Sequence, residues 1–344
     1  MHTCTRGLHQ GATRGQVCPP YAKGIKHLDE RKIRLGISAC LLGQTVRWNG
    51  THKLDRYLTE TLGQFVEYVP VCPEVECGLP VPREPMRLVG DPEHPRLVTT
   101  RTGVDRTDQM LAWAHRRVAE LESEGLCGFI FKANSPSSGM ERVKVYNEKG
   151  VAEKRGVGMF ARAFMEHFPL LPAEDEGRLH DMKLRESFIE RVFALQRWRD
   201  TLERGRTRGN LVEFHTRHKL LLLAHSPEHY RAMGRLVAHA KETPAEELFP
   251  QYERLLMDAL RLKTTPSKHA NVLQHILGYF KQQLSADEKQ ELLEVIAHFR
   301  RGDVPLIVPI TLINHYVRKY GQPYLRDQCY LHPHPLELQL RNHV

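Results

Sequence analysis

The chain has 344 residues, of which 41% are hydrophobic, and it carries 50 basic and 41 acidic side chains. This length predicts two domains with apolar cores, and no apolar run is long enough to cross a membrane. Seven scattered cysteines are too few for a disulfide scaffold, and the basic N-terminus lacks the apolar region of a secretory signal. We therefore expect a cytoplasmic protein, where clustered cysteines serve metal binding or catalysis more often than disulfides.

The charge is unevenly distributed along the chain. Residues 1–32 carry 6 basic and 2 acidic side chains, residues 33–196 carry 22 and 23, and residues 197–344 carry 22 and 16. A basic segment beside a neutral one is typical of a polyanion-binding module joined to a catalytic one. An ordinary solvated surface would also explain an excess of this size. Residues 1–32, with Cys4 and Cys18, show no periodicity and predict a disordered basic arm.

Short apolar runs alternate with helical patterns over residues 33–180, which predicts an α/β domain with a mainly parallel, helix-covered sheet. A Gly-Asp-Pro turn between two further runs predicts a hairpin. The expected strands are 33–39, 66–71, 87–89, 96–99, 128–131 and 143–146, and the expected helices are 54–62, 107–124 (with Thr107 as its cap) and 159–168.

The pattern then becomes helical and stays so, which predicts an all-α bundle over residues 181–344. Ser226 and Thr243 each precede a proline, an arrangement typical of a helix start. Proline lacks a backbone N–H, and the N–H of the first helical residue has no partner within the helix in any case. Thr243 and Ser285 are each followed three residues later by glutamate, the spacing of a capping box. We place the boundary between the two domains between residues 172 and 208.

Three predicted strands end in loops that carry chemistry. Cys40 follows the first, Cys72 and Cys77 follow the second, and the hydroxyl-rich segment 135–139 follows the strand 128–131. The carboxyl ends of parallel strands meet at one edge of a sheet, so these loops should converge. Three thiolates would suit a 4Fe-4S cluster with one open iron. The alternative is three small core residues, since free cysteines are often buried.

Carboxylates and hydroxyls in the same loops could move protons. Glu74 and Glu76 are two residues apart, so only one of them can face a site in an extended loop, and we choose Glu74 as the general acid or base. The other is then a solvated charge. Ser135, in the loop Ser-Pro-Ser-Ser-Gly, could donate a proton or hold an anion. An ordinary serine-proline turn is the plain alternative.

The helical segment offers candidate contacts for a polyanion. His215 and His218 have the spacing of a metal pair but lack a third ligand nearby, which disfavours zinc. Tyr279 could stack on a base, although core packing explains it as well. Six basic side chains are predicted to contact RNA phosphates, unless they only form a solvated helical surface: Arg217, Lys219, Lys263, Lys268, His269 and Lys281.

Three motifs in order resemble the thiouracil desulfidase (TudS) family. They are Ser-Ala-Cys-Leu-Leu-Gly at 38–43, Cys-Pro-Glu at 72–74 and Ser-Pro-Ser-Ser-Gly at 135–139. The segments 214–219 and 271–280 resemble the YbgA-type helical domain. Together the two parts resemble the RudS-type desulfidases, which remove sulfur from 4-thiouridine in tRNA.

The resemblance implies a Rossmann-like domain that holds a 4Fe-4S cluster by three cysteines, and a helical domain that binds tRNA. Cys40 and Cys72 would be ligands, and Glu74 and Ser135 would handle protons and orient the substrate. The family usually has cysteine in its last motif where this chain has Ser138, and a hydroxyl is a poor iron ligand beside thiolates. We predict Cys77 as the replacement ligand, with Cys127 as the second choice.

The expected activity is therefore the hydrolytic, non-redox conversion of 4-thiouridine in tRNA to uridine with release of sulfide. Two alternatives remain open. One is a desulfidase of free thiolated bases such as thiouracil. The other is a non-catalytic RNA-binding protein whose cluster site has degenerated, an alternative suggested by Ser138 in place of the usual cysteine.

Overall fold

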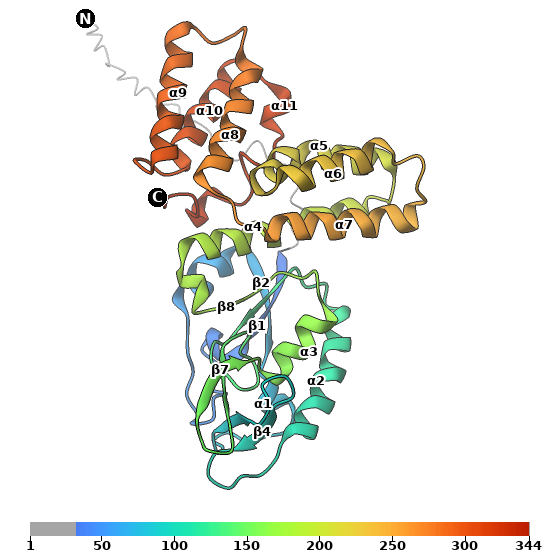
Figure 1. Ribbon diagram of the computed structural model, residues 1–344, viewed down its shortest axis with the longest axis vertical. Coiled ribbons are helices and arrows are strands. Elements are labelled where there is room, and N and C mark those ends of the chain that lie inside the picture. Colours follow the sequence, from blue (N-terminus) through green and yellow to red (C-terminus); the bar gives the residue numbers. More distant parts are fainter. Residues whose placement is uncertain (1–31, 344) are drawn as a thin grey trace, which may run out of the picture. The chain divides into compact units, whose positions relative to one another are not determined.

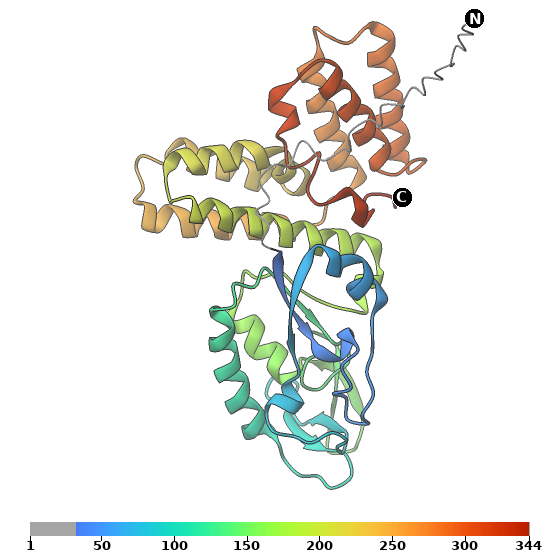
Figure 2. The same cartoon turned by 180° about the vertical axis from the view of Figure 1, so that it is seen from behind.

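The computed structural model describes residues 32–343 (Figure 1), and Figure 2 shows the same chain from behind. The expected basic arm, with Cys4 and Cys18, therefore lies almost entirely outside the described residues. Residues 32–344 group into a single compact unit, so the division into 33–180 and 181–344 stays a prediction. Within the described part of the chain, every helix is too short or too polar to cross a membrane.

The central sheet, which was predicted to be mainly parallel, is parallel throughout, and its strands follow the order β2-β1-β5-β8, of which β8 was not predicted. These strands are β1 (Ile33–Ser38), β2 (Val66–Val71), β5 (Phe129–Phe131) and β8 (Ala173–Asp175). Every residue of β5 is buried, because a central strand covered on both faces needs apolar side chains on both. The carboxyl ends of all four strands lie at one edge of this sheet.

A second sheet was not predicted. It has the order β4-β3-β6-β7, and its strands are β3 (Met86–Val89), β4 (Arg96–Thr99), β6 (Val143–Tyr146) and β7 (Ala152–Gly156). The expected hairpin is confirmed as β3–β4, and β6–β7 forms another, while β3 and β6 pair in parallel. Alternation of strands and helices predicts that strands exist but does not say which of them pair, so the two sheets were taken as one.

Two helices that the sequence predicts flank the central sheet, α2 (Thr107–Glu122) and α3 (Met159–His167). The Phe129 ring lies 4.7 Å from that of Phe164 and 5.6 Å from that of Phe160, measured between centroids. Thr107 does not cap α2, because its hydroxyl accepts a bond from the Leu97 amide at 2.9 Å instead. The segment 54–62 forms only short turns, a π-helical one at Tyr57–Thr61 and a 3-10 one at Leu62–Gln64.

From Met182 to Arg326 the chain is mainly helical, as predicted, whereas residues 327–343 form turns and one 3-10 turn at Leu336–Leu338. Ser226 caps α6 and Ser285 forms the full capping box of α9, whereas Pro244 rather than Thr243 stands at the start of α7. The helices are α4 (Met182–Glu203), α5 (Arg208–His225), α6 (Pro227–Ala238), α7 (Ala245–Arg261), α8 (Pro266–Leu277), α9 (Ala286–Arg301), α10 (Ile307–Lys319) and α11 (Pro323–Arg326).

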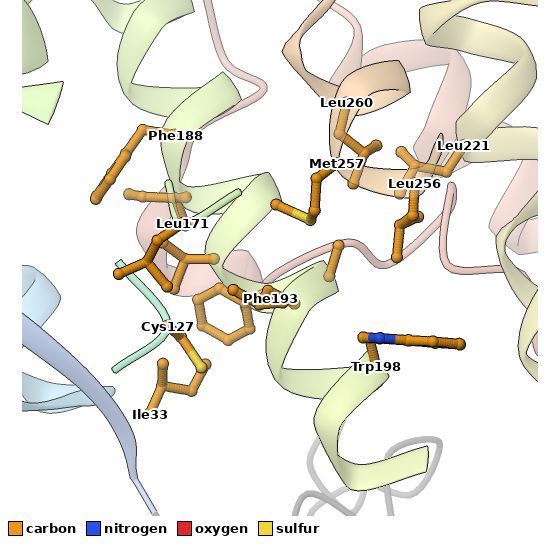
Figure 3. Packing of buried hydrophobic residues seen from close by; sticks show 14 of the residues in the cluster. Ile33, Cys127, Leu171, Phe188, Phe193, Trp198, Leu221, Leu256, Met257 and Leu260 are labelled. Atoms are coloured by element: carbon orange, nitrogen blue, oxygen red, sulfur yellow. The ribbon is translucent and has the colours of Figure 1, made fainter. Parts of the chain in front are cut away.

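Helix α4 joins the region of the central sheet to the helical region that follows, through apolar side chains on two of its faces. Figure 3 shows its Phe188 and Phe193 beside Leu171, Cys127 and Ile33, and its Trp198 on the side of α7. The Trp198 ring stacks on Tyr252 of α7 with centroids 5.0 Å apart. A helix that is apolar around most of its circumference is a buried one. This explains why 32–344 forms one unit although the sequence pattern changes near residue 180.

A buried ionic network ties α4 to the C-terminal segment. Glu190 accepts a bond from His225 Nε2 at 2.6 Å and pairs with Arg341 at 3.3 Å, and all three side chains are at most 5% exposed. Both ring nitrogens of His225 face acceptors, Glu190 and the Leu262 carbonyl at 2.7 Å, so the ring must donate from both. Burial by itself would raise the pKa of Glu190, but these two cationic partners outweigh it and lower the pKa to about 2.

Removing one member of this network should be costly. Arg341→Met is expected to lower the free energy of unfolding by about 3–5 kcal/mol, because Glu190 and Glu186 would stay buried with one cation fewer. Urea denaturation followed by tryptophan fluorescence measures the change. Arg326→Met, which removes an exposed arginine, is the matched control and should change stability little. Equal unfolding midpoints for the two variants would contradict the assigned role of Arg341.

Candidate active site

A cavity of about 390 Å³ lies where the predicted loops converge. Its walls come from the ends of β1, β2 and β5 and from the segment that enters β3. The lining brings together four of the predicted site residues, Cys40, Cys72, Glu74 and Ser135. It also contains Ser138 and residues that the sequence did not single out, among them Arg47, Trp48, Lys53, Arg83, Lys132 and Ser137.

The two thiols are placed by the ends of neighbouring strands. Cys40 lies in the 3-10 turn Ala39–Leu42 that follows β1, and Gly43 ends this turn in a left-handed conformation (φ 88°). Cys72 directly follows β2 and precedes the short helix α1 (Pro73–Glu76). Burial raises the pKa of Cys40 to about 11 and that of Cys72 above its ordinary value. Both thiols are therefore protonated at neutral pH unless a bound metal ion replaces their protons.

Glu74 is the best-connected side chain of the cavity. Its Oε2 accepts from Arg83 Nε at 2.7 Å and also from Nη2 of the same guanidinium, and the Arg83 side chain is only 6% exposed. Its Oε1 accepts from the Ser137 hydroxyl at 2.9 Å. This arrangement fixes the carboxylate from two sides.

A chain of hydroxyls leads from Glu74 into the cavity. Ser137 Oγ lies 3.0 Å from Ser135 Oγ, and the only proton of the Ser137 hydroxyl is donated to Glu74. Ser135 must therefore be the donor between the two serines. The backbone amide of Ser138 also donates to Ser135 Oγ at 3.1 Å, which holds that hydroxyl in place. The result is a proton relay from Ser135 through Ser137 to Glu74.

Among the residues that the structure describes, Cys40 and Cys72 are the only cysteines in the cavity lining. The predicted third ligand, Cys77, is absent from the lining, and its sulfur lies 3.3 Å from the Glu74 carbonyl oxygen. Cys127 is buried at the amino end of β5, where its sulfur contacts Gln196 at 3.1 Å, so the second choice is wrong. Ser138 lines the cavity instead.

The donor set fits an iron–sulfur group only in part. Two thiols near a carboxylate suit a soft metal, but a cluster held by three thiolates needs one more than the described lining supplies. Residues 32–343 also contain no cluster of three or more histidine, cysteine, aspartate or glutamate side chains arranged to hold a metal ion.

Glu76, the carboxylate that we did not choose, turns away from the cavity. Its Oε1 accepts from the Cys72 backbone amide at 2.7 Å, and its Oε2 lies 3.1 Å from Arg117 of α2. It thus fixes the loop that carries Cys72. Arg83 was missed because nothing in its local sequence links it to Glu74, nine residues earlier. Ser137 lies in the Ser-Pro-Ser-Ser-Gly loop, of which the sequence analysis gave a proton-transfer role only to Ser135. The same hydroxyl-rich motif could have pointed to Ser137 as well.

Two of the six predicted RNA contacts are used inside the protein. His269 is buried, its Nδ1 lies 3.0 Å from the Tyr330 hydroxyl, and burial lowers its pKa to about 3. The prediction for His269 is wrong, because a neutral, enclosed ring cannot bind a phosphate. The Lys268 ammonium donates to the carbonyls of His225 and Lys263 at 2.7 and 2.8 Å, so it bridges two helix ends.

The other four lie at or near the surface. Lys263 and Lys281 are exposed, and Arg217 is exposed beside Glu213 at 3.5 Å. The Lys219 ammonium lies 5.0 Å from the centre of the Tyr324 ring. Tyr279 stacks on the same ring with centroids 4.9 Å apart and is 42% exposed, so the core alternative for Tyr279 does not hold.

The two histidines at zinc-like spacing have separate partners. His215 Nδ1 lies 3.1 Å from the Tyr252 hydroxyl, and His218 stacks on Phe214 and bonds to its carbonyl at 2.8 Å. Burial lowers the pKa of His215 to about 4 and that of His218 to about 3. Both rings are neutral core residues, in line with the weak case for zinc.

Comparisons with known proteins match both parts of the chain. Residues 35–176 match the family described as 2-thiouracil desulfurase, and residues 219–335 match the family DUF1722, described as a protein of unknown function. The Escherichia coli (strain K12) protein YbgA is 35% identical over 158 residues, which cover 46% of this chain and 94% of YbgA. The Bacillus subtilis (strain 168) protein YbbK is 30% identical over 108 residues, which cover 30% of this chain and 71% of YbbK.

Among solved structures, the [4Fe-4S]-dependent thiouracil desulfidase TudS is 31% identical, with 44% of this chain and 95% of that one covered and a TM-score of 0.36. The two family matches follow one another along the chain without overlap. The chain therefore belongs to the 2-thiouracil desulfurase family through its N-terminal part and to the YbgA-like DUF1722 family through its C-terminal part.

Proposed function

We propose that the protein is an iron–sulfur-dependent desulfidase that converts 4-thiouridine in tRNA to uridine and releases sulfide. The observation that carries this proposal is the cavity itself, in which two thiols lie beside a carboxylate with a proton relay. The family match supports a thiolated pyrimidine as the substrate class. In the proposed reaction, C=S and water give C=O and hydrogen sulfide, so no electrons are gained or lost.

Cys40 and Cys72 would hold the 4Fe-4S cluster, with the third protein ligand still to be assigned. When bound, such a cluster supplies a soft Lewis acid for a thiocarbonyl sulfur. Glu74 accepts the proton of the attacking water, because Arg83 keeps the carboxylate paired and oriented. Once Glu74 holds this proton it donates to Ser137, and Ser137 in turn donates to Ser135, so the Ser135 hydroxyl is free to donate a hydrogen bond to the pyrimidine as charge develops.

The test compares substrates on anaerobically reconstituted protein. Turnover of tRNA containing 4-thiouridine, with uridine and sulfide formed in equal amounts, is the expected result. Turnover of free thiouracil alone would favour the free-base desulfidase. Ser138 is the observation that favours a non-catalytic RNA-binding protein, and absence of both iron and turnover, with tRNA still bound, would establish that alternative.

The helical part should bind tRNA mainly through phosphate contacts. We expect the logarithm of the binding constant to fall linearly with the logarithm of salt concentration, by about 0.7–0.9 per neutralised phosphate. Lys281→Ala should reduce that slope by about one and weaken binding to all sequences alike. Arg116→Ala, on α2, is the control. Fluorescence anisotropy between about 50 and 200 mM salt measures both effects, and an affinity independent of salt would contradict the phosphate contacts.

A further inference from the structure

Three cations form a row across one face of the second sheet, on the consecutive strands β3, β6 and β7. Lys144 of β6 pairs directly with Lys154 of β7. The parallel register that pairs Leu88 of β3 with Val145 of β6 places Arg87 beside Lys144. Residues paired across a sheet point to the same face, and neighbouring strands lie about 4.8 Å apart. The three side chains, here called the cationic row, therefore span roughly 10 Å.

The row lies on the solvent-facing side of this sheet. Both of its lysines are exposed. The Arg87 guanidinium carbon lies 5.2 Å from the centre of the Tyr146 ring, and Tyr146 follows Lys144 by two residues on β6. Side chains two residues apart on a strand share a face, so the arginine, the ring and the lysine lie together. The buried Leu88 and Val145 point to the opposite face.

The described chain does not neutralise the cationic row. Within residues 32–343, its three side chains form no ion pair with a carboxylate, and Arg87 Nε is buried without a hydrogen-bond partner. Other cations of the same sheet do have partners, since Arg96 of β4 lies 3.5 Å from Asp105 and Arg155 of β7 lies 3.8 Å from Glu153. Like charges directly opposite each other destabilise a sheet. A ligand with several negative charges in line would remove this repulsion.

The length of the row fits a nucleic-acid backbone. A strand of duplex nucleic acid carries a phosphate about every 3.4 Å, so a row of roughly 10 Å faces about three successive phosphates. The row is separate from the cavity, because Met86 lines the cavity and Arg87, the next residue, points to the other face of β3. It can therefore contact only a part of the RNA that lies away from the reacting base.

We propose that Arg87, Lys144 and Lys154 form a phosphate-binding surface that holds the RNA substrate by its backbone. The inference rests on the proposed function and adds to it a surface in the N-terminal part of the chain. RNA binding is then shared between the second sheet and the helical part. Phosphate contacts carry no sequence information, so the row adds affinity without base preference. A free base such as thiouracil has no backbone to reach it.

The test measures binding of unmodified tRNA to the full-length holoenzyme by fluorescence anisotropy at several salt concentrations. Lys144→Ala and Lys154→Ala should each reduce the slope of log K against log salt by about 0.7–0.9, which corresponds to roughly five- to eightfold weaker binding at about 0.1 M salt. Lys144→Arg keeps the charge and should keep the slope. The matched control is Arg116→Ala, which removes an exposed arginine of α2 that lies 3.9 Å from Glu120, and should leave the slope unchanged.

Folding of the variants is checked by their thermal unfolding midpoints. We expect no decrease for Lys144→Ala, because the substitution removes a repulsion between neighbouring strands. Turnover gives a second measurement, in which Lys144→Ala should lower the ratio of kcat/KM between tRNA containing 4-thiouridine and free thiouracil by a factor similar to its effect on binding.

Unchanged slopes in both lysine variants would overturn the surface while leaving the desulfidase function standing. Reduced slopes in a protein that turns over no substrate would support the surface and refute the proposed function. Binding to phosphatidylserine vesicles is measured with the same variants. If both substitutions weaken vesicle binding and leave tRNA binding unchanged, the row faces an anionic membrane and the proposed RNA contact is wrong.

Discussion

Replacement of Glu74 by glutamine is expected to lower kcat for desulfuration by roughly 10²–10⁴-fold, the range for removal of a general acid or base. The amide keeps the size of the side chain but cannot accept the proton of the attacking water. The measurement is single-turnover release of sulfide at saturating substrate, which separates chemistry from binding. Iron content and the thermal unfolding midpoint are measured on the same sample, because the variant leaves Arg83 without its anionic partner.

Two further variants separate the carboxylate from its surroundings. Ser137→Ala keeps Glu74 but breaks the relay to Ser135, and should cost about tenfold in kcat, the value of one hydrogen bond to a charged group. Glu67→Gln removes a carboxylate from the solvent side of β2 and should leave kcat unchanged. A full rate in Glu74→Gln with iron retained would exclude Glu74 as the proton acceptor.

Replacement of Cys40 or Cys72 by serine is expected to abolish both cluster binding and activity. Anaerobic reconstitution of the wild type should give about four irons and four labile sulfides with a broad visible absorption, and either variant should fall to background. The physical reason is that a hydroxyl is a poor iron ligand where a thiolate is required. Iron and sulfide analysis needs no substrate, so this result stands apart from the activity assay.

The third ligand is tested by the same analysis. Cys77→Ser is expected to retain iron, because its sulfur lies against the Glu74 carbonyl and outside the cavity lining. Ser138→Cys places a third thiol in the cavity and should slow iron loss to a chelator. Loss of iron in Cys77→Ser would restore Cys77 as the ligand and show that α1 rearranges on loading. An unchanged rate of iron loss in Ser138→Cys would exclude position 138 as the site of the third protein ligand of the cluster.

Part of the site followed from one rule. Cys40, Cys72 and Ser135 each follow a predicted strand, and parallel strands bring their carboxyl ends to one edge. Arg83 could not be found this way, because it follows no strand and reaches Glu74 through a loop whose path depends on the second sheet. The same limit applies to His269. Its place next to Lys268 on a predicted helix suggested an exposed side chain, but the distant residue Tyr330 packs against the ring and buries it.

The sequence by itself determined the order and type of the main elements, the parallel sheet and the loops that carry its chemistry, because hydrophobic periodicity and turn residues are local signals. Only the tertiary structure decided that β3 to β7 form a separate sheet, that Cys77 lies outside the cavity, and that Arg83, Ser137 and Glu74 form one hydrogen-bonded unit. These outcomes depend on which distant segments pack together, and that choice is made by the whole set of contacts rather than by any local pattern.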